Sequence, residues 1–183
     1  MIYLASASPR RAQLLKQIDV PFSLVNADIE EIRKTDESAQ DYVLRLALEK
    51  AQAGFKNSDR SKPTLGADTI VVIDQHILEK PANQLAAKKM LQLLSGRTHQ
   101  VYTAIALVNS HFSKTQLVKT DVSFKILSEQ EIDQYWLTGE PLDKAAGYAI
   151  QGIAGKFVIN ISGSYSAVVG LPLYETALLI KEF

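Results

Sequence analysis

The run from Thr64 to Ile73 constrains the fold of this chain more than any other part of the sequence. Its residues, Thr-Leu-Gly-Ala-Asp-Thr-Ile-Val-Val-Ile, are apolar on both faces when they are laid out as an extended strand. A strand of this kind is typical of the middle of a sheet with covered faces, and not of an edge. The run therefore predicts a central strand in a sheet with helices packed against it.

Asp68 lies in the middle of this predicted central strand. A buried carboxylate without compensation costs several kcal/mol, so Asp68 needs a cation, a metal ion or a proton beside it. A structural ion pair is one explanation. Gly66, two residues earlier, indicates a close backbone approach, which an ion pair alone does not require. A structural role and a functional role for Asp68 are both open at this point.

The rest of the chain predicts strands and helices that interleave. Strands are expected at residues 2–5, 20–25, 99–108, 117–126, 157–161 and 168–169, with a hairpin turn at 74–76. Helices are expected from Pro9 onward and at residues 38–53, 84–94, 128–138 and 173–183, with Gly54 ending the second and a capping box of Ser128 and Glu131 opening the fourth. This alternation indicates a mixed α/β sheet with helices on its faces.

Composition limits the classes of function. The chain has 183 residues, and Lys plus Arg and Asp plus Glu both total 20, so no overall field favours a nucleic-acid polymer or a membrane surface. The absence of cysteine excludes disulfides and thiolate metal sites. Neither a signal sequence nor a run of bilayer-spanning length is visible. A cytoplasmic protein with one compact or bilobal domain over residues 1–183 is the simplest expectation.

The chain begins with a predicted strand that leads directly into a helix. Ser8 and Pro9 have the residue types of an N-cap and a first helical position. A helix start has unpaired N–H groups that favour an anion, yet Arg10 and Arg11 occupy this first turn, where cations are normally disfavoured. A bound phosphate would explain this placement better than a solvated helix start with two extended arginines.

A set of polar side chains lies near the ends of predicted elements, where folding does not obviously need them. They are Ser8, Arg10, Arg11, Glu30, Lys50, Asp68, Thr69, Lys80, Arg97, Asp143, Lys144 and Gln151. A set with many cations and few carboxylates is typical of a polyphosphate site. In such a site the cations bind phosphate oxygens, and the carboxylates bind a divalent cation and a water molecule. The chain has no P-loop, no dinucleotide-binding fingerprint and no serine-hydrolase elbow, and its three histidines lack metal-ligand spacing.

Seven motifs, in this order, resemble those of the Maf family. They are Ser6-Ala7-Ser8-Pro9-Arg10-Arg11, Gly66-Ala67-Asp68-Thr69, Glu79-Lys80-Pro81, Leu94-Ser95-Gly96-Arg97-Thr98-His99, Glu140-Pro141-Leu142-Asp143-Lys144-Ala145, Ile150-Gln151-Gly152, and Gly163-Ser164-Tyr165 with Val169-Gly170-Leu171-Pro172-Leu173. They cover nearly the whole chain. The pattern is similar to the subgroup that hydrolyses dTTP and UTP to the monophosphate and pyrophosphate.

The resemblance implies a fold, a cofactor and roles for residues. The fold is a bilobal mixed α/β fold like that of inosine triphosphate pyrophosphatases, with the active cleft between the lobes. The cofactor is a divalent metal, Mg²⁺ or Mn²⁺, and a homodimer in the cytoplasm is expected. By resemblance the catalytic residues are Asp68, Glu30, Lys50 and Lys80, with Asp68 and Glu30 as metal ligands, and the substrate-binding residues are Ser8, Arg10, Arg11, Thr69 and Gln151.

One loop departs from the family pattern. The family commonly has Asp-Lys-Ala-Gly-Ala-Tyr-Gly-Ile-Gln-Gly, whereas this chain has Ala146, Gly147 and Ala149 at the three positions that differ. An alanine that replaces a glycine held at positive φ would force this loop to shift. The identity of Gln151 is therefore better supported by the pattern than its position.

Two functions from different classes are consistent with these residues. In the first, Asp68 and Glu30 support attack by water on the α-phosphorus, and the Gln151 amide reads the acceptor–donor–acceptor edge of thymine or uracil or, alternatively, only braces its own loop. In the second, the protein senses a nucleotide and regulates cell division, because the Maf family is associated with inhibition of septum formation. The carboxylates favour the enzyme, since they would repel phosphate in a pure anion sensor.

Overall fold

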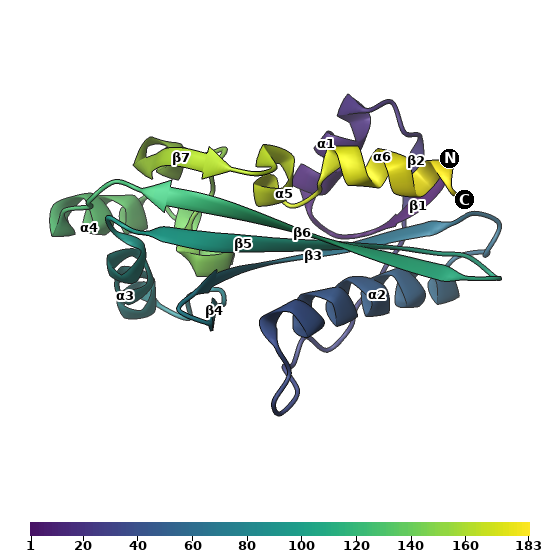
Figure 1. Ribbon diagram of the computed structural model, residues 1–183, viewed down its shortest axis with the longest axis horizontal. Helices are drawn as coiled ribbons and strands as arrows, with labels where there is room; N and C mark the ends of the chain where they lie inside the picture. Colours follow the sequence, from purple (N-terminus) through teal and green to yellow (C-terminus); the bar gives the residue numbers. More distant parts are fainter. The chain divides into compact units, whose positions relative to one another are not determined.

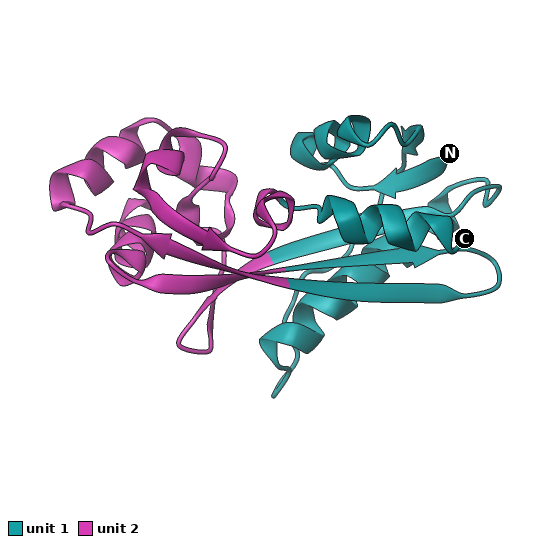
Figure 2. Cartoon of the chain, turned by 45° about the horizontal axis from the view of Figure 1, so that its top comes forward, with its two compact units in different colours: residues 1–69, 103–118, 170–183 teal, residues 70–102, 119–169 magenta.

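The computed structural model describes residues 1–183 and divides into two compact units. Unit 1 contains residues 1–69, 103–118 and 170–183, and unit 2 contains residues 70–102 and 119–169 (Figure 2). Three long strands contribute residues to both units: β3 (Thr64–Ile73), β5 (Thr98–Val108) and β6 (Ser113–Phe124). The mixed α/β class expected from the sequence is confirmed. No helix is both long enough and apolar enough to cross a membrane.

Unit 1 is built around a parallel strand trio in the order β2-β1-β3. Its further elements are β1 (Ile2–Ala5), α1 (Pro9–Gln17), β2 (Phe22–Leu24), α2 (Ala39–Asn57) and α6 (Leu173–Lys181). The α1 connection moves from β1 to one neighbour and the α2 connection returns to the other. Because such crossovers are right-handed, the two helices cover opposite faces of the sheet. Figure 1 shows α2 on one face and α1 and α6 on the other.

The strand order of unit 1 places a binding position at the carboxyl end of β1. The strand order reverses at β1, and in open α/β sheets ligands bind outside the strand ends at such a reversal. The register pairs Ala5 with Gly66 of β3, so the loop after β1 lies beside Asp68 and Thr69. The predicted central position of β3 is confirmed, because its neighbours are β1 and β5 and nearly all of its residues are buried.

Unit 2 combines antiparallel pairing with short helices around an aromatic core. Its further elements are β4 (His76–Leu78), α3 (Gln84–Leu94), α4 (Glu129–Leu137), η1 (Glu140–Asp143), η2 (Ala145–Gly147), η3 (Ile153–Phe157), β7 (Val158–Ser162) and α5 (Tyr165–Val169). β4 pairs with β3 and β7 with β6, both antiparallel. The buried cluster includes Phe124, Tyr135, Tyr148 and Phe157, whose rings meet edge to face. The predicted capping box of Ser128 and Glu131 is present at the start of α4.

Two of the predicted elements are wrong in detail. The second helix does not end at Gly54 but continues to Asn57. A Cβ atom on Gly54 would lie 2.6 Å from Cβ of Ala5, so this glycine serves close packing of α2 on β1 and not helix termination. The strand expected at residues 168–169 is instead the last turn of α5. Ser164 Oγ accepts a hydrogen bond from the amide of Ala167, which favours a helical start over an extended chain.

Candidate active site

The central polar group of unit 1 is an ion-pair cluster on Lys50. Lys50 Nζ donates to Asp68 Oδ1 at 2.6 Å and lies 2.8 Å from Glu31 Oε1. The side chains of Lys50 and Asp68 are 12% and 9% exposed, whereas that of Glu31 is 48% exposed. The buried carboxylate predicted in the middle of β3 therefore has a cation as its partner.

Gly66 explains how Lys50 reaches Asp68. A Cβ atom on Gly66 would lie 2.4 Å from the carbonyl oxygen of Ala47 and 2.5 Å from the amide nitrogen of Ala51, both on α2. Side chains alternate along a strand, so Gly66 and Asp68 share the sheet face that α2 covers. The glycine lets α2 approach the strand closely, and Lys50 of this helix then lies next to Asp68. The close approach expected at Gly66 is thus made by α2.

On the opposite face of β3, Thr69 contacts Arg11 of α1. Arg11 Nη2 donates to Thr69 Oγ1 at 3.3 Å, Nη1 donates to Ser6 Oγ at 3.2 Å, and Nε donates to the carbonyl oxygen of Gly170 at 2.8 Å. None of these partners is a carboxylate. Burial lowers the pKa of Arg11, and the nearby charge of Asp68 opposes this effect. A guanidinium held among neutral oxygens with free N–H groups is prepared to bind an anion.

The other residues predicted in the β1–α1 segment have fewer contacts. Ser8 occupies the N-cap position of α1, but its side chain forms no capping hydrogen bond, and its amide donates to Ser6 Oγ at 3.2 Å. Pro9 begins the helix as expected. Arg10 is half-buried and has no ion-pair partner within the chain. The hydroxyl of Ser8 and the guanidinium of Arg10 are therefore available to a ligand.

The acidic loop (residues 25–37) brings Glu31, and not Glu30, to Lys50. Glu30 is exposed and has no ion pair within the chain, while the backbone oxygen of Glu31 also accepts a hydrogen bond from Tyr42 at 3.1 Å. The sequence pointed to Glu30, and the contact of its neighbour Glu31 with Lys50 was not predicted. The only signal for Glu31 in the sequence is its place in the same acidic stretch, because the direction of each side chain depends on how the loop packs on α2.

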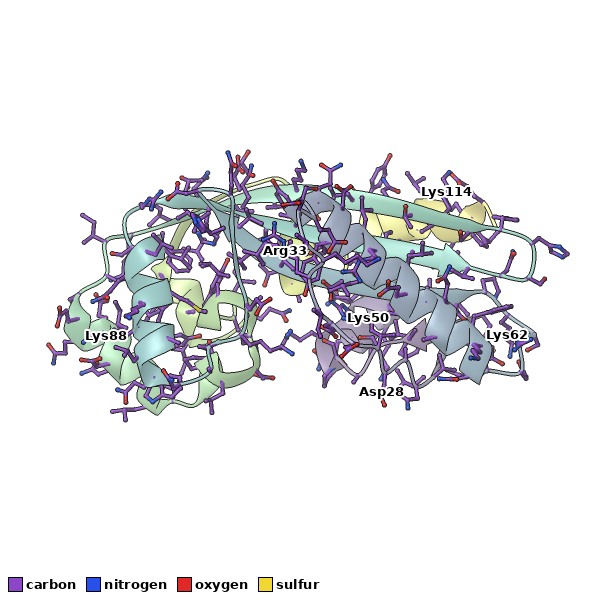
Figure 3. All side chains as sticks on the ribbon, turned by 90° about the horizontal axis from the view of Figure 1, so that it is seen from below. Asp28, Arg33, Lys50, Lys62, Lys88 and Lys114 are labelled. Carbon is purple, nitrogen blue, oxygen red and sulfur yellow. The ribbon has the colours of Figure 1, made fainter.

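Arg45 of α2 holds the acidic loop, and this role was not predicted. Its Nε and Nη2 donate to the two carboxylate oxygens of Glu37 at 2.6 and 2.8 Å, and Nη2 also donates to the carbonyl oxygen of Ile32 at 2.9 Å. Hydrogen bonding from Arg45 lowers the pKa of Glu37 to about 2. Arg33 donates to the backbone oxygen of Glu37 from within the loop. Figure 3 labels Lys50 on α2 and Arg33 on this loop.

The donor set of unit 1 fits a metal ion that is held mainly by substrate and water. No group of three or more His, Cys, Asp or Glu side chains gathers in the protein, so it offers no all-protein cage. Mg²⁺ commonly takes one or two carboxylates together with phosphate oxygens and several waters. Asp68 Oδ1 is bound to Lys50, whereas Oδ2 accepts no hydrogen bond from the chain. Oδ2 and the partly exposed Glu31 carboxylate are the suitable oxygens.

Two predicted site residues, Lys80 and Gln151, belong to unit 2. Both are exposed, and neither side chain forms a hydrogen bond or ion pair within the chain. Their segments lie together, because the carbonyl oxygen of Glu79 accepts from the amide of Ala146 at 3.0 Å. The absence of any bond from the Gln151 amide argues against the alternative that this side chain braces its own loop. That Lys80 and Gln151 share a substrate with Asp68 stays a prediction.

The Gln151 loop (residues 145–157) contains the predicted departure from the family pattern. Ala146 is fully buried and has φ of 55° and ψ of 15°, a left-handed conformation that glycine adopts without strain. Ala149 is not at positive φ, so only one of the two alanines occupies a strained position. The hydrogen bond from the Ala146 amide to Glu79 and the burial of its side chain hold this conformation in place.

The buried pair of His99 and Tyr148 supports the Gln151 loop from the core of unit 2. His99 Nε2 lies 2.7 Å from the hydroxyl of Tyr148, and His99 Nδ1 is buried without a partner. Burial lowers the pKa of His99 to about 4, and burial also raises the pKa of Tyr148. At neutral pH the pair is uncharged. His99 therefore anchors Tyr148 in the core and is not a candidate metal ligand.

Three other polar residues singled out in the sequence have local partners. Arg97 donates to both carboxylate oxygens of Asp74 at 2.7 and 2.8 Å, which ties the end of α3 to the β3–β4 turn. Lys144 pairs with its neighbour Asp143. These pairs account for Arg97 and Lys144 without a ligand.

The chain is similar to known proteins along its whole length. The family model described as "Maf-like protein" matches residues 1–183. The dTTP/UTP pyrophosphatase of Vibrio parahaemolyticus is 55% identical over 100% of this chain and 96% of its own length. The enzymes of the same name from Salmonella typhimurium and Escherichia coli O157:H7 are 56% and 53% identical, each over 100% of this chain and 92% of its own length.

Solved structures with some likeness come from two bacteria. A nucleoside-triphosphatase described as a dITP/XTP pyrophosphatase from Mycobacterium abscessus has 20% identity and a TM-score of 0.43 over 67% of this chain and 73% of that chain. The Ham1 protein of Staphylococcus aureus has 16% identity and a TM-score of 0.45 over 69% of this chain and 71% of that chain. The full-length family match and the sequence identities, which all exceed 50%, establish that the chain belongs to the Maf family.

Proposed function

We propose that this protein is a nucleoside triphosphate pyrophosphatase that converts dTTP and UTP to the monophosphate and pyrophosphate. The observation that carries the proposal is similarity along the whole chain to enzymes named dTTP/UTP pyrophosphatase. The polar cluster of unit 1 supports it independently, because Asp68, Lys50 and Arg11 combine a carboxylate with cations at the strand end where α/β sheets bind ligands.

In the proposed reaction, Asp68 acts on the attacking water. The water oxygen forms a bond to the α-phosphorus, the bond from this phosphorus to the bridging α–β oxygen breaks, and pyrophosphate leaves. Asp68 takes the proton of the water and later returns it to solvent. Lys50 holds this carboxylate in place through its 2.6 Å contact with Oδ1. Lys50 also adds positive charge where negative charge develops.

The remaining cations and hydroxyls serve the phosphates in this proposal. Arg10 and Arg11 donate N–H groups to phosphate oxygens at the start of α1, where the backbone amides add to the attraction. Ser8 and Thr69 supply hydroxyl donors beside them. Lys80, which has no partner within the chain, neutralises the departing pyrophosphate. The arrangement explains why two arginines occupy a helix start that otherwise disfavours cations.

A divalent ion, Mg²⁺ or Mn²⁺, completes the proposed site. Asp68 Oδ2 and the acidic loop, with Glu30 and Glu31 as its carboxylates, would hold it together with phosphate oxygens and waters. When bound, such an ion neutralises charge on the phosphates. We propose Glu31 as the principal loop ligand, since it already lies 2.8 Å from Lys50, and Glu30 as a second carboxylate of the same loop.

Base selection is assigned to Gln151. A glutamine amide offers an acceptor and two donors, so Gln151 is suited to accept from N3–H and to donate to O4 or O2 of thymine or uracil. Cytosine reverses the pattern at N3 and N4. The free, exposed amide of Gln151 supports this role. No residue has been identified that reads the 2′-position, and dTTP and UTP are therefore expected to be hydrolysed comparably.

The cell location and assembly are also proposals. We propose a cytoplasmic homodimer that acts on free nucleotides and not on nucleic-acid polymers or membranes. Tyr135 is buried in the core of unit 2, which removes it from any interface. Light scattering at working concentration tests the dimer, and a monomer mass would remove this claim without affecting the enzyme assignment.

Release of pyrophosphate from dTTP, UTP, CTP and 7-methyl-GTP in the presence of Mg²⁺ or Mn²⁺ tests the function. dTTP and UTP should be the best substrates. Asp68→Asn keeps the size of the side chain and removes its charge, so turnover should fall by about 10²–10⁴-fold while thermal unfolding shows a folded protein. Normal hydrolysis by the folded variant would refute the role of Asp68. Tight nucleotide binding without any release by the unmodified protein would favour a nucleotide sensor.

A further inference from the structure

The Gln151 loop has little regular structure of its own. It contains the short turns η2 and η3 and is interrupted by Ala146 at positive φ. An exposed amide that discriminates between bases must nevertheless be held within a fraction of an ångström, because hydrogen bonds weaken steeply with misalignment. Some other part of unit 2 must therefore fix the backbone near Gln151.

We infer that Glu140 is a positioning residue that fixes the backbone next to Gln151 and thereby sets base discrimination. The inference rests on the proposed base-reading function of Gln151. Glu140 lies at the start of η1, after α4, and is separated from Gln151 by eleven positions in the chain. Its carboxylate is half-buried and has no cation as a partner. It binds donors of the loop and of the core instead.

Both carboxylate oxygens of Glu140 are used. Oε2 accepts from the amide of Ile153 at 2.9 Å, and Oε1 accepts from the amide of Ala154 at 3.3 Å and from the hydroxyl of Tyr135 at 2.7 Å. Tyr135 is 2% exposed, and burial together with this hydrogen bond raises its pKa. One carboxylate thus connects the loop amides to a phenol that is anchored in the aromatic core.

Gly152 shows how closely the loop is seated on this carboxylate. A Cβ atom on Gly152 would lie 2.2 Å from Glu140 Oε2 and 2.4 Å from Cδ. The residue that directly follows Gln151 therefore rests against the carboxylate, with no space for a side chain between them. The glycine and the glutamate form a matched pair, since any side chain at residue 152 would push the loop away from its two hydrogen bonds.

The charge of Glu140 is suited to this task. A carboxylate accepts from several N–H groups at once, whereas a glutamine amide presents one acceptor and a donor. Glu140→Gln keeps the shape of the side chain but turns one of its atoms into a donor that faces a backbone N–H or the Tyr135 hydroxyl. The variant should make the backbone beside Gln151 more mobile without creating a cavity in the core.

The first measurement is hydrogen exchange in the full-length protein, with Glu129→Gln as the matched control. Glu129 is an exposed carboxylate of α4 in the same unit. In Glu140→Gln the amides of Ile153 and Ala154 should exchange about tenfold faster or more, because they lose a charged acceptor. The control should leave them unchanged. Unchanged exchange in Glu140→Gln would overturn the inference.

The second measurement is the ratio of kcat/KM for UTP to that for CTP. Glu140→Gln should lower this ratio by about 5–50-fold through the UTP value alone, because a displaced Gln151 loses its contacts with the preferred base. A purely structural role would lower kcat/KM for both nucleotides by the same factor. Should Glu140→Gln fold poorly, Tyr135→Phe removes only the hydrogen bond from the Tyr135 hydroxyl to Oε1 and should lower the ratio by a smaller factor.

A double variant separates the inference from the function on which it rests. If Glu140 acts through Gln151, Glu140→Gln combined with Gln151→Ala should discriminate no worse than Gln151→Ala alone. Additive losses would overturn the inference. If Gln151→Ala leaves discrimination unchanged, the base-reading function fails and the inference falls with it. If Gln151→Ala lowers discrimination and Glu140→Gln does not, only the positioning role is refuted.

Discussion

The acidic loop of unit 1 and the Gln151 loop of unit 2 are both held by side-chain hydrogen bonds to the backbone, but the side chains carry opposite charges. Both lack long regular elements, and in each an acidic or basic side chain binds the backbone. Arg45 donates to a backbone carbonyl of the acidic loop and to Glu37, whereas Glu140 accepts from two backbone amides of the Gln151 loop. Backbone carbonyls and amides of an irregular segment need hydrogen-bond partners. A basic side chain can bind the carbonyls, as Arg45 does, and an acidic side chain can bind the amides, as Glu140 does.

The two loops differ in what surrounds the charge. Arg45 and Glu37 form an ion pair whose side chains are 17% and 9% exposed. The Gln151 loop rests on Tyr135 and on the His99–Tyr148 pair, which are buried and uncharged. The acidic loop is therefore held by an ion pair, while the Gln151 loop is held by Glu140 together with buried, uncharged groups. The expected effects below test this division.

Among the tests of this comparison, the largest effect is expected from the acidic loop. Glu31→Gln should lower kcat/KM by about 10²-fold for every nucleotide, because it removes a charge that lies beside Lys50 and Asp68. Glu30→Gln is the comparison variant and should lower kcat/KM by a smaller factor, because Glu30 has no ion pair with Lys50. Steady-state kinetics with dTTP, UTP and CTP measure both. A greater loss in Glu30→Gln would reverse the assignment of the two carboxylates.

Gln151→Ala should act on only some substrates. The loss of a paired polar group should lower kcat/KM for dTTP and UTP by a factor equivalent to about 1–3 kcal/mol, with little change for CTP and 7-methyl-GTP. The measurement is kcat/KM for the four nucleotides. Equal losses for all four would show that Gln151 supports the loop, and the contrast between a base-reading unit 2 and a catalytic unit 1 would then break down.

Acid sensitivity should separate the two units. Burial lowers the pKa of His99 from its ordinary value of 6.5 to about 4 in the folded protein. Between pH 6.5 and pH 4 the unfolded chain therefore binds more protons than the folded protein. Stability should therefore fall as pH drops, by about 2 kcal/mol between pH 8 and pH 5. Urea unfolding at several pH values measures this loss.

The same pH series includes an internal comparison. His99→Gln should flatten the dependence between pH 8 and pH 5, because it removes the titrating group. Glu37 has a pKa lowered to about 2, so its contribution is present above about pH 4.5 and is lost only as the pH falls further toward 2. Glu37→Gln should leave the slope above pH 5 intact. An unchanged slope in His99→Gln would contradict the assignment to unit 2.

The smallest effect is expected from Arg45→Lys. Lysine keeps the charge but cannot contact both oxygens of Glu37 and the carbonyl of Ile32 together, so stability should fall by about 1 kcal/mol and kcat/KM by a few-fold for all nucleotides. Lys88→Arg on α3 is a surface control. A loss confined to dTTP and UTP would mean that the acidic loop also contributes to base selection.

Much of the secondary structure is visible in local patterns. The apolar run at β3, the capping box of α4 and the Ser8-Pro9 start of α1 depend on residues close together in the chain, and all three are as expected. The predicted end of α2 is wrong because Gly54 is needed for close packing against Ala5, which is far away in the sequence. A glycine that ends a helix and one that permits close packing have the same appearance in a single sequence.

The chemistry of the site is likewise divided. Residue types and motif order point to polyphosphate hydrolysis, since Asp68, Lys50 and Arg11 are recognisable by charge and position along the chain. Tertiary structure alone shows that Lys50 binds Asp68, because that contact requires Gly66 to admit α2. It also places Glu31, and not Glu30, next to Lys50, and it shows that Arg45 and Glu140 bind the backbone of the two loops. Charge and hydrophobic pattern are local properties, but the partner of a side chain depends on backbone directions that only the packed fold establishes.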